Sequence, residues 1–153
     1  ATVCGYSPRM RLDISVNMLT MQALTKKIIT VFGGKQVRPN INIYDLVNVY
    51  KYFLQNSDIA SGAYNAGFEN ISILEIAERI KSKIPTQIKV TESNDPRSYR
   101  QNSDKLLATG FKQQFNVDDA ILEIIEKFNN EELSDKDEYY TIKTMKKILS
   151  INK

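Results

Sequence analysis

The sequence contains no histidine and only one cysteine, Cys4. A single thiol cannot form an internal disulfide, and without imidazole the chain lacks the commonest general base near neutral pH. Imidazole is also the commonest metal ligand, so the absence of histidine excludes a zinc site of the usual kind. It equally excludes a Ser-His or Cys-His nucleophile. We therefore expect no metal site within the chain.

Long apolar runs are also missing. No stretch approaches the roughly 18 to 20 apolar residues of a membrane-spanning helix, and the first residues lack a charged-then-apolar secretory pattern. The net charge is +3, from 21 basic and 18 acidic residues dispersed along the chain. A charge this mild does not indicate nucleic-acid binding. The expected protein is cytoplasmic, with neither a membrane nor a nucleic acid as partner.

The apolar spacing predicts one small α/β domain. The length of 153 residues and a hydrophobic content of 42% are ordinary for such a domain. Spacings of three and four residues predict helices, and short β-branched runs predict strands. Helices are expected at 12–27, 44–55, 103–109 and around 142–149, and strands at 28–32, 40–43, 63–66 and 88–91.

Two further helices are predicted from their first residues. Ser72 and Glu75 have the S-x-x-E spacing of a capping box before an apolar stripe. Asp118 precedes a second stripe and is expected to cap that helix. Between this helix and the last one, the charged segment 129–138 is expected to be a linker.

A series of short motifs occurs in order over about residues 1 to 130. Each motif is weak alone, but the order and spacing of the set resemble the C-terminal half of extended short-chain dehydrogenases/reductases, the NAD-dependent epimerase/dehydratase family that acts on nucleotide sugars. The motifs are Thr2-Val3-Cys4-Gly5, Ser7-Pro8-Arg9, Asn17, Ile29-Thr30-Val31-Phe32-Gly33-Gly34, Gln36-Val37-Arg38-Pro39, Ile43-Tyr44-Asp45-Leu46, Gly62-Ala63-Tyr64-Asn65-Ala66-Gly67, Ser72-Ile73-Leu74-Glu75-Ile76-Ala77, Asp95-Pro96-Arg97-Ser98-Tyr99-Arg100, Lys105 and Leu107-Ala108-Thr109-Gly110-Phe111.

The resemblance implies a domain organisation. Residues 1–130 would form a small α/β substrate-binding lobe of short strands with packed helices, with 1–5 as the end of a Rossmann-type strand, and 131–153 would form a charged linker and a C-terminal helix. The family's N-terminal half carries a G-x-x-G-x-x-G loop and a catalytic Tyr-x-x-x-Lys pair, and both are missing here. Tyr139 and Lys143 match the pair's spacing but follow the lobe, so the match is interpreted as accidental. We expect a chain cut from a longer parent, with no catalytic residue and no activity alone.

The resemblance also implies a site for a nucleoside-diphosphate sugar. A diphosphate carries about two negative charges, which the paired donors of arginine match well. Arg38 is the first candidate, with a surface arginine beside a turn as its alternative. Arg97 and Arg100 follow, and surface ion pairs are the alternative for both. Further substrate-binding candidates are Asn17, Gln36, Val31, Phe32, Ser7 and Arg9.

Several of these residues have a structural alternative. Gln36 would then only complete a turn, Val31 and Phe32 would belong to the core, and Arg9 or Arg11 would pair with Asp13. The resemblance places Thr2, Val3 and Cys4 nearest the NAD or NADP of the full-length parent. Cys4 is interpreted as a small buried filler. We expect no tight cofactor binding by this chain alone.

The predicted function is the substrate-binding part of an NAD(P)-dependent nucleoside-diphosphate-sugar epimerase or dehydratase, whose parent could be a homodimer. One alternative is a stand-alone, non-catalytic module that binds nucleotide sugars. The other is an assembly protein whose C-terminal stripe of Ile142, Met145 and Ile148 docks a partner.

Overall fold

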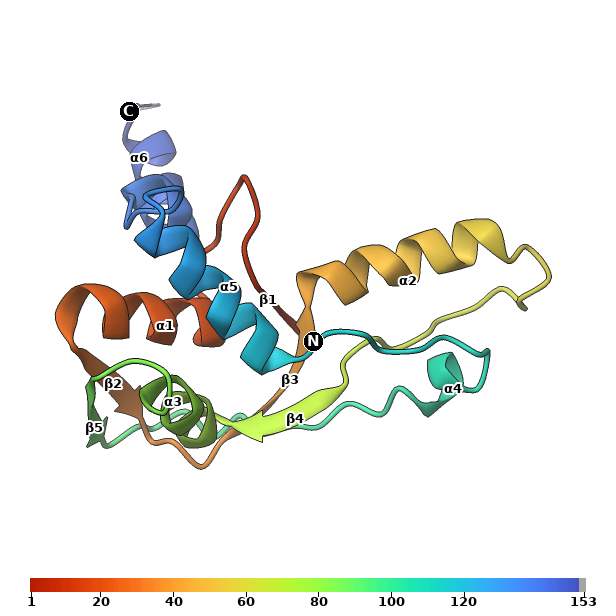
Figure 1. Ribbon diagram of the computed structural model, residues 1–153, viewed down its shortest axis with the longest axis horizontal. Coiled ribbons are helices and arrows are strands. Elements are labelled where there is room, and N and C mark those ends of the chain that lie inside the picture. Colours follow the sequence, from red (N-terminus) through yellow and green to blue (C-terminus); the bar gives the residue numbers. More distant parts are fainter. Residues whose placement is uncertain (152–153) are drawn as a thin grey trace.

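The computed structural model describes residues 1–151, which form two small sheets surrounded by helices (Figure 1). In the first sheet, β3 (Val37–Asn42) lies between β1 (Thr2–Cys4) and β4 (Glu69–Ser72). β1 pairs with β3 in parallel, and β4 pairs with β3 antiparallel. The second sheet is a parallel pair of β2 (Ile28–Phe32) and β5 (Gln87–Thr91). The predicted α/β fold is confirmed.

The helices divide into three groups in space (Figure 1). Three of them pack together beside the sheets: α1 (Ser15–Lys26), α3 (Ile73–Lys81) and α5 (Val117–Asn129). The long α2 (Ile43–Gln55) and the short α4 (Asp104–Leu107) project to the other side. At the periphery, beyond α5, the 3-10 turn η1 (Asp137–Tyr139) leads into α6 (Thr141–Ile151). No helix of the described chain has the length and apolar content needed to cross a membrane.

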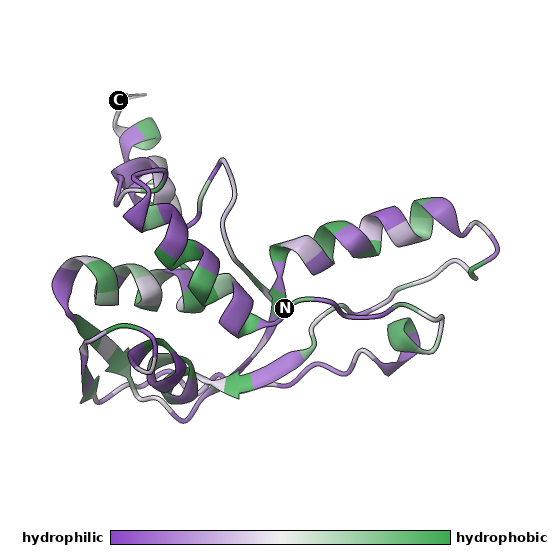
Figure 2. Cartoon of the chain, viewed as in Figure 1, coloured by the Kyte–Doolittle hydropathy of each residue, from purple (hydrophilic) through white to green (hydrophobic). Residues whose placement is uncertain are grey.

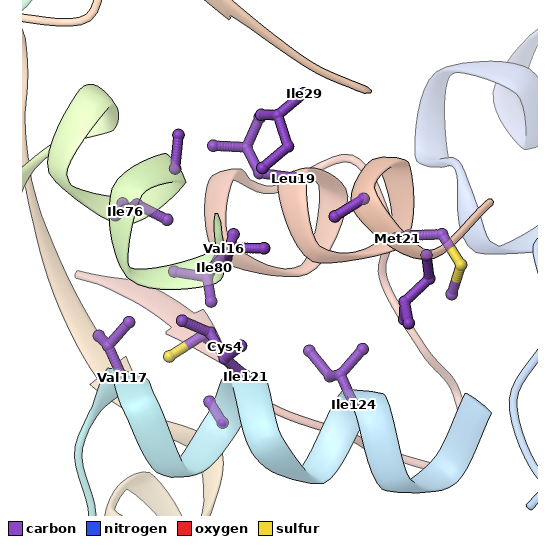
Figure 3. Close-up of a cluster of buried hydrophobic side chains, with 14 of the residues drawn as sticks. Cys4, Val16, Leu19, Met21, Ile29, Ile76, Ile80, Val117, Ile121 and Ile124 are labelled. Atoms are coloured by element: carbon purple, nitrogen blue, oxygen red, sulfur yellow. The ribbon is translucent and has the colours of Figure 1, made fainter. Parts of the chain in front are cut away.

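The main core lies where α1, α3 and α5 meet (Figure 3). Helix α5 contributes Val117, Ile121 and Ile124, which face side chains from the other two helices and from β1 and β2. Close packing of these buried side chains holds the three helices together as one unit. A second, smaller cluster joins α2 to α4 through Val49, Leu106 and Phe111.

The helix starts are partly those expected. The Ser72 hydroxyl accepts a hydrogen bond from the Glu75 amide at 3.1 Å, so the predicted cap of α3 is confirmed. The reciprocal half of the box is absent, because the Glu75 carboxylate accepts from Arg79 instead. At α5 the prediction was wrong: the cap is Asn116, which exchanges hydrogen bonds with Asp119.

Asp118 has a different role. Its carboxylate pairs with Arg79 of α3 and with Lys83 just after that helix, so it ties the start of α5 to α3 and the turn that follows it. A side chain two residues into a helix points away from the terminal amides, whereas the preceding Asn can reach them. The sequence contained both residues, and only the backbone geometry distinguishes the cap from its neighbour.

The prediction of a strand at 63–66 was wrong. These residues have no partner strand, and their polar groups bond locally, as in the contact from the Tyr64 hydroxyl to the Ala60 carbonyl. The strand is β4, which begins later and carries the polar Glu69 and Asn70. The Asn70 side chain is hydrogen-bonded to the backbone of Gln101. A polar residue is therefore accommodated in β4, and the strand lacks the alternating apolar pattern that would reveal it in the sequence.

Strand β3 begins three residues earlier than expected and contains Pro39. A proline within a central strand removes a ladder hydrogen bond unless its nitrogen faces an unpaired edge. Here β1 pairs with β3 only from Asn40 onward, while Pro39 is opposite Asn70 of β4. The proline therefore lies where β3 has a neighbour on one side only.

The segment after α5, expected to be a charged linker, is attached to the body. Leu133 is buried in the main core. The Leu12 amide donates to the Tyr139 carbonyl at 2.8 Å, and the Thr141 amide donates to the Asp13 carboxylate at 2.9 Å. The start of α6 is therefore held against the loop that follows β1.

The thiol of Cys4 is 1% exposed and donates a hydrogen bond to the Ile41 carbonyl. Burial in this apolar setting raises the pKa of Cys4 to about 12, because the thiolate would be poorly solvated. We expect a thiol-alkylating reagent at pH 8 to label the native protein at least a hundredfold more slowly than the denatured protein. The rate should rise with denaturant along the unfolding transition, and equal rates in both states would contradict the burial of Cys4.

Candidate functional site

Arg38 lies near the start of β3, and its side chain is only 13% exposed. One terminal nitrogen donates to the carbonyls of Val37 and Arg97, and the other contacts the Asp95 carboxylate at 3.3 Å. The guanidinium also lies over the ring of Tyr99, 5.1 Å from its centroid, at a distance typical of a cation-π contact. Arg38 is thus held by the segment that follows β5.

Arg97 approaches the same carboxylate from solvent, with 76% of its side chain exposed. Its Nε and Nη2 atoms each contact one Asp95 oxygen at 2.7 Å, and its amide donates to Oδ1 at 3.1 Å. These hydrogen bonds from Arg97, followed by the charge of Arg38, hold the pKa of Asp95 well below its ordinary value. Asp95 is therefore an anion shared by two guanidinium groups.

The loop that carries Asp95 is pinned along β3. The Val37 amide donates to the Ser98 hydroxyl at 3.0 Å, and the Tyr99 amide donates to the Val37 carbonyl at 3.3 Å. The Asp95 amide in turn donates to the Ser93 hydroxyl. Two segments that are about 60 residues apart in sequence therefore lie side by side, and they place Arg38 and Arg97 in one cluster.

The turn between β2 and β3 lies against the same loop. Gly33 and Gly34 have φ angles of +76° and +100°, which suit glycine because a side chain is strained there. The Gln36 side chain accepts from the Gly34 amide and donates to the Phe32 carbonyl at 2.5 Å. Gln36 thus completes the turn, as its structural alternative proposed.

The two apolar candidates of β2 differ in position. Val31 is fully buried in the main core, so its side chain cannot touch a ligand in this structure. Phe32 is 57% exposed at the end of β2, where it is paired with Thr91 of β5. Of the two, only the Phe32 ring offers an exposed surface to a planar group.

The third arginine is not part of this cluster. Arg100 is exposed and lines a hollow of about 470 Å³ with Asn70, Ser103 and Gln113. The polar groups of those neighbours are already hydrogen-bonded within the chain. The structure therefore brings together Arg38 and Arg97 and leaves Arg100 on a separate surface.

A hollow of about 340 Å³ lies beside β1. It is lined by Thr2, Val3, Ser7 and Asn17 among others. Asn17 is buried: its amide nitrogen donates to the carbonyls of Gly5 and Arg11, and its oxygen accepts from the Gly5 amide. Both donors are occupied in holding the turn after β1, so Asn17 has no donor left for a phosphate in this structure.

Arg9 faces yet another hollow, of about 400 Å³, between its own loop and α6. The Ser7 hydroxyl donates to the Arg9 carbonyl and holds this loop in shape. The Arg11 guanidinium contacts Asp13 at 2.7 Å, which matches the ion-pair alternative. Neither Arg9 nor Ser7 belongs to the Arg38 cluster.

Sequence reasoning did not select Asp95 or Tyr99, although both belong to the cluster. The local signal was the Asp-Pro-Arg spacing, since an aspartate readily accepts a hydrogen bond from the amide two residues later. The contact of either residue with Arg38 spans about 60 positions, and the spacing within one motif does not reveal it.

The residues nearest a nicotinamide cofactor by resemblance do not form a cofactor site by themselves. The Cys4 thiol points into the core and bonds Ile41, so it cannot contact a cofactor. Thr2 and Val3 line one wall of the β1 hollow, and the sequence holds no glycine-rich loop for a dinucleotide phosphate. Within the described chain, these residues can supply at most one wall of such a site.

No family model matches this sequence. Among solved structures, the chain is similar to a dTDP-glucose 4,6-dehydratase from Bacillus anthracis in complex with NAD, with 18% identity, a TM-score of 0.69, and coverage of 92% of this chain and 46% of the other. An ADP-L-glycero-D-manno-heptose-6-epimerase from Helicobacter pylori has 18% identity and a TM-score of 0.69, over 84% and 42% of the two chains. A GDP-mannoheptose C4 reductase from Campylobacter jejuni with NADP bound has 25% identity and a TM-score of 0.57, over 68% and 33%.

These proteins are all larger, and this chain spans less than half the length of each. The dehydratase match extends over nearly the whole chain, whereas the reductase match covers about two thirds of it. The structure of the chain therefore matches part of the extended short-chain dehydrogenase/reductase fold found in NAD-dependent epimerases and dehydratases.

Proposed function

We propose that this chain is the substrate-binding part of an NAD(P)-dependent epimerase or dehydratase of nucleoside-diphosphate sugars, and that residues 1–130 form its binding lobe. The observation that carries the proposal is the convergence of Arg38 and Arg97 on one carboxylate. Two guanidinium groups around a single anion form a strongly cationic position with fixed donor directions. The fold likeness to enzymes named for nucleotide-sugar substrates supports the same assignment.

In the ligand-free chain, the anion in this position is Asp95. A diphosphate offers acceptor oxygens of the same kind, with about two negative charges instead of one. Arg97 is exposed and can turn toward an incoming ligand, while the less exposed Arg38 stays fixed by Tyr99 and two carbonyls. In the proposed complex, the diphosphate takes over part of the donors that Asp95 now holds.

In the proposed complex, the rest of an elongated ligand extends to either side of the Arg38 cluster. The exposed Phe32 ring, at the end of β2, is suited to contact the base. In the other direction, Asn40 is two residues after Arg38 on β3, which is about 7 Å along the strand, and its parallel partner is Thr2 of the β1 hollow. Thr2 and Arg38 therefore lie on the same face of the sheet. We assign the β1 hollow to the sugar end.

The proposed role is binding and orientation, without a proton or hydride step by this chain. The sequence has no G-x-x-G-x-x-G loop. Lys143 contacts Asp137 and the ring of Tyr140, so its ammonium group is not paired with Tyr139. NAD or NADP would supply the hydride acceptor in the full-length parent. A stand-alone binding module would use the same arginines, so the experiment below tests the site in either case.

Removal of Arg97 is the structurally safe test of the site, because that side chain is mostly exposed. We expect Arg97→Ala and Arg38→Ala each to weaken binding of UDP-glucose, GDP-mannose or dTDP-glucose by about 1.5 to 3 kcal/mol, the range for a hydrogen bond to a charged group. Isothermal titration calorimetry of the intact chain measures this loss, starting with the best ligand of the three.

Arg100→Ala is the matched control, since it removes an exposed arginine of the same loop that lies outside the cluster. It should leave the affinity unchanged. Equal losses for Arg97→Ala and Arg100→Ala would indicate a general charge effect, and unchanged binding by both Arg97→Ala and Arg38→Ala would remove the proposed site.

Replacement of the competing anion should have the opposite effect. Asp95→Asn keeps a side-chain oxygen as acceptor but removes one negative charge, so we expect nucleotide-sugar affinity to rise by about fivefold, the effect of one charge at about 4 Å in water. The pKa of Asp95 lies below its ordinary value of 3.8, so the wild-type carboxylate stays ionised at mildly acidic pH. The difference between the two proteins should therefore be constant from about pH 7 to pH 5.

The same pKa sets the sign of the effect on folding. The ion pairs of Asp95 stabilise the folded chain above the ordinary pKa, and their contribution is lost as the pH falls through the lower folded value. Calorimetric titrations with the nucleotide sugar at several pH values check the affinity difference, and urea denaturation at the same pH values checks the effect on folding. Wild-type affinity that converges on that of Asp95→Asn between pH 7 and pH 5 would show that the Asp95 carboxyl takes up a proton above its ordinary pKa, which contradicts its pairing with two guanidinium groups.

A further inference from the structure

Helix α6 has an exposed apolar side that no other part of the described chain covers. Four of its large apolar residues are between 48% and 67% exposed. They are Ile142, Met145, Ile148 and Leu149, and their spacing places them on one side of the helix. Figure 2 shows that the peripheral helix α6 carries both hydrophobic and hydrophilic positions. This amphipathic surface plays no part in the Arg38 cluster.

The charge of α6 has one sign. The ionisable residues between Thr141 and Ile151 are Lys143, Lys146 and Lys147, and the helix contains no acidic residue. Lys143 and Lys147 are four positions apart on the side away from the apolar residues, and Lys146 lies at the border next to Ile142. Lys143 contacts Asp137, while Lys146 and Lys147 have no acidic group within 4 Å in residues 1–151.

Within residues 1–151, only the first turn of α6 is hydrogen-bonded to the rest of the chain. The Thr141 amide bonds the Asp13 carboxylate, and the Thr144 hydroxyl bonds the Glu138 carbonyl at 3.2 Å. The hollow of about 400 Å³ beside the helix has Arg9 and Arg11 at its loop side and Met145 and Ile148 at its helix side, together with Glu138. Two more arginines therefore lie next to the apolar residues.

We propose that α6 binds a membrane surface that contains anionic lipids, although the sequence alone predicts no membrane partner. The helix would lie in the plane of the interface, with Ile142, Met145, Ile148 and Leu149 among the acyl chains and the lysines at the headgroups. A short amphipathic helix with lysines on its polar side and large apolar residues opposite is typical of such binding. The absence of a spanning helix does not bear on this mode, because an interfacial helix does not cross the bilayer.

Pairing with a second copy of α6 is the alternative that the charge disfavours. Two copies paired through their apolar sides would bring the border residue Lys146 of each copy into one small interface, and like charges repel at that distance. The helix has 11 residues, about one and a half heptads, whereas stable coiled coils sustain the pattern over at least three. A lipid surface with negative headgroups matches both the apolar side and the charge. This inference does not rest on the proposed nucleotide-sugar site.

The chain has no tryptophan, so one introduced tryptophan reports on its own surroundings. We would place it at the half-exposed Ile148 (Ile148→Trp) and, as a control, at the exposed Leu54 of α2 (Leu54→Trp). Fluorescence of the Ile148→Trp protein should shift to shorter wavelength with vesicles of phosphatidylcholine and phosphatidylserine and not with phosphatidylcholine alone. The Leu54→Trp spectrum should not change.

The lysines are tested by vesicle flotation. Each lysine near an anionic surface contributes about fivefold in affinity, so Lys146→Gln with Lys147→Gln should weaken binding by about 25-fold. Lys51→Gln, at an exposed lysine of α2, is the matched control and should bind the vesicles as tightly as the unsubstituted chain does. Leu149→Ser should also weaken flotation, while leaving helix content and the unfolding transition unchanged, because Leu149 is exposed.

Three results would overturn the proposal. The first is equal binding to the two kinds of vesicle, and the second is no binding to either. The third is self-association in sedimentation velocity without vesicles that Leu149→Ser abolishes, which would assign the apolar side to a second copy. Nucleotide-sugar affinity should be the same for all α6 variants, so this test and that of the Arg38 cluster fail independently.

Discussion

The shared carboxylate of Asp95 is the interaction on which the proposed site depends. It holds two guanidinium groups that come from distant parts of the sequence, and it does so at the place where the segment after β5 lies along β3. Without it, Arg38 and Arg97 would repel each other and the loop would lose its main ionic contact with β3. In our proposal, a negatively charged ligand takes the place of Asp95 at this position.

The sequence predicted the layout of the chain better than it predicted individual contacts. The periodicity of α1, α2 and α3 and the β-branched run of β2 located these elements to within a few residues, because each contributes apolar residues to one of the two buried clusters. β4 was missed because Glu69 and Asn70 are polar, and their side chains are satisfied by the backbone of other segments. Such contacts depend on residues more than 30 positions away.

The candidate site was only partly predictable, again because its contacts join residues that are far apart in the sequence. Arg38 and Arg97 were selected by motif and do lie together, but Asn17 and Gln36 proved to be engaged with the backbone of their own turns. A polar residue near a glycine turn has two possible uses, to bind a ligand or to replace a missing backbone partner. Sequence alone cannot decide between them, since the decision depends on which amides the turn leaves unpaired.

The burial of Leu133 bears on where the globular body ends. A composition change at residue 130 suggests a boundary, yet Leu133, three residues later, fills space between the packed helices. A chain shortened at residue 130 would expose that apolar pocket to water and lose the hydrogen bond from Leu12 to Tyr139. A minimal domain for crystallisation or nuclear magnetic resonance should therefore extend through residue 140.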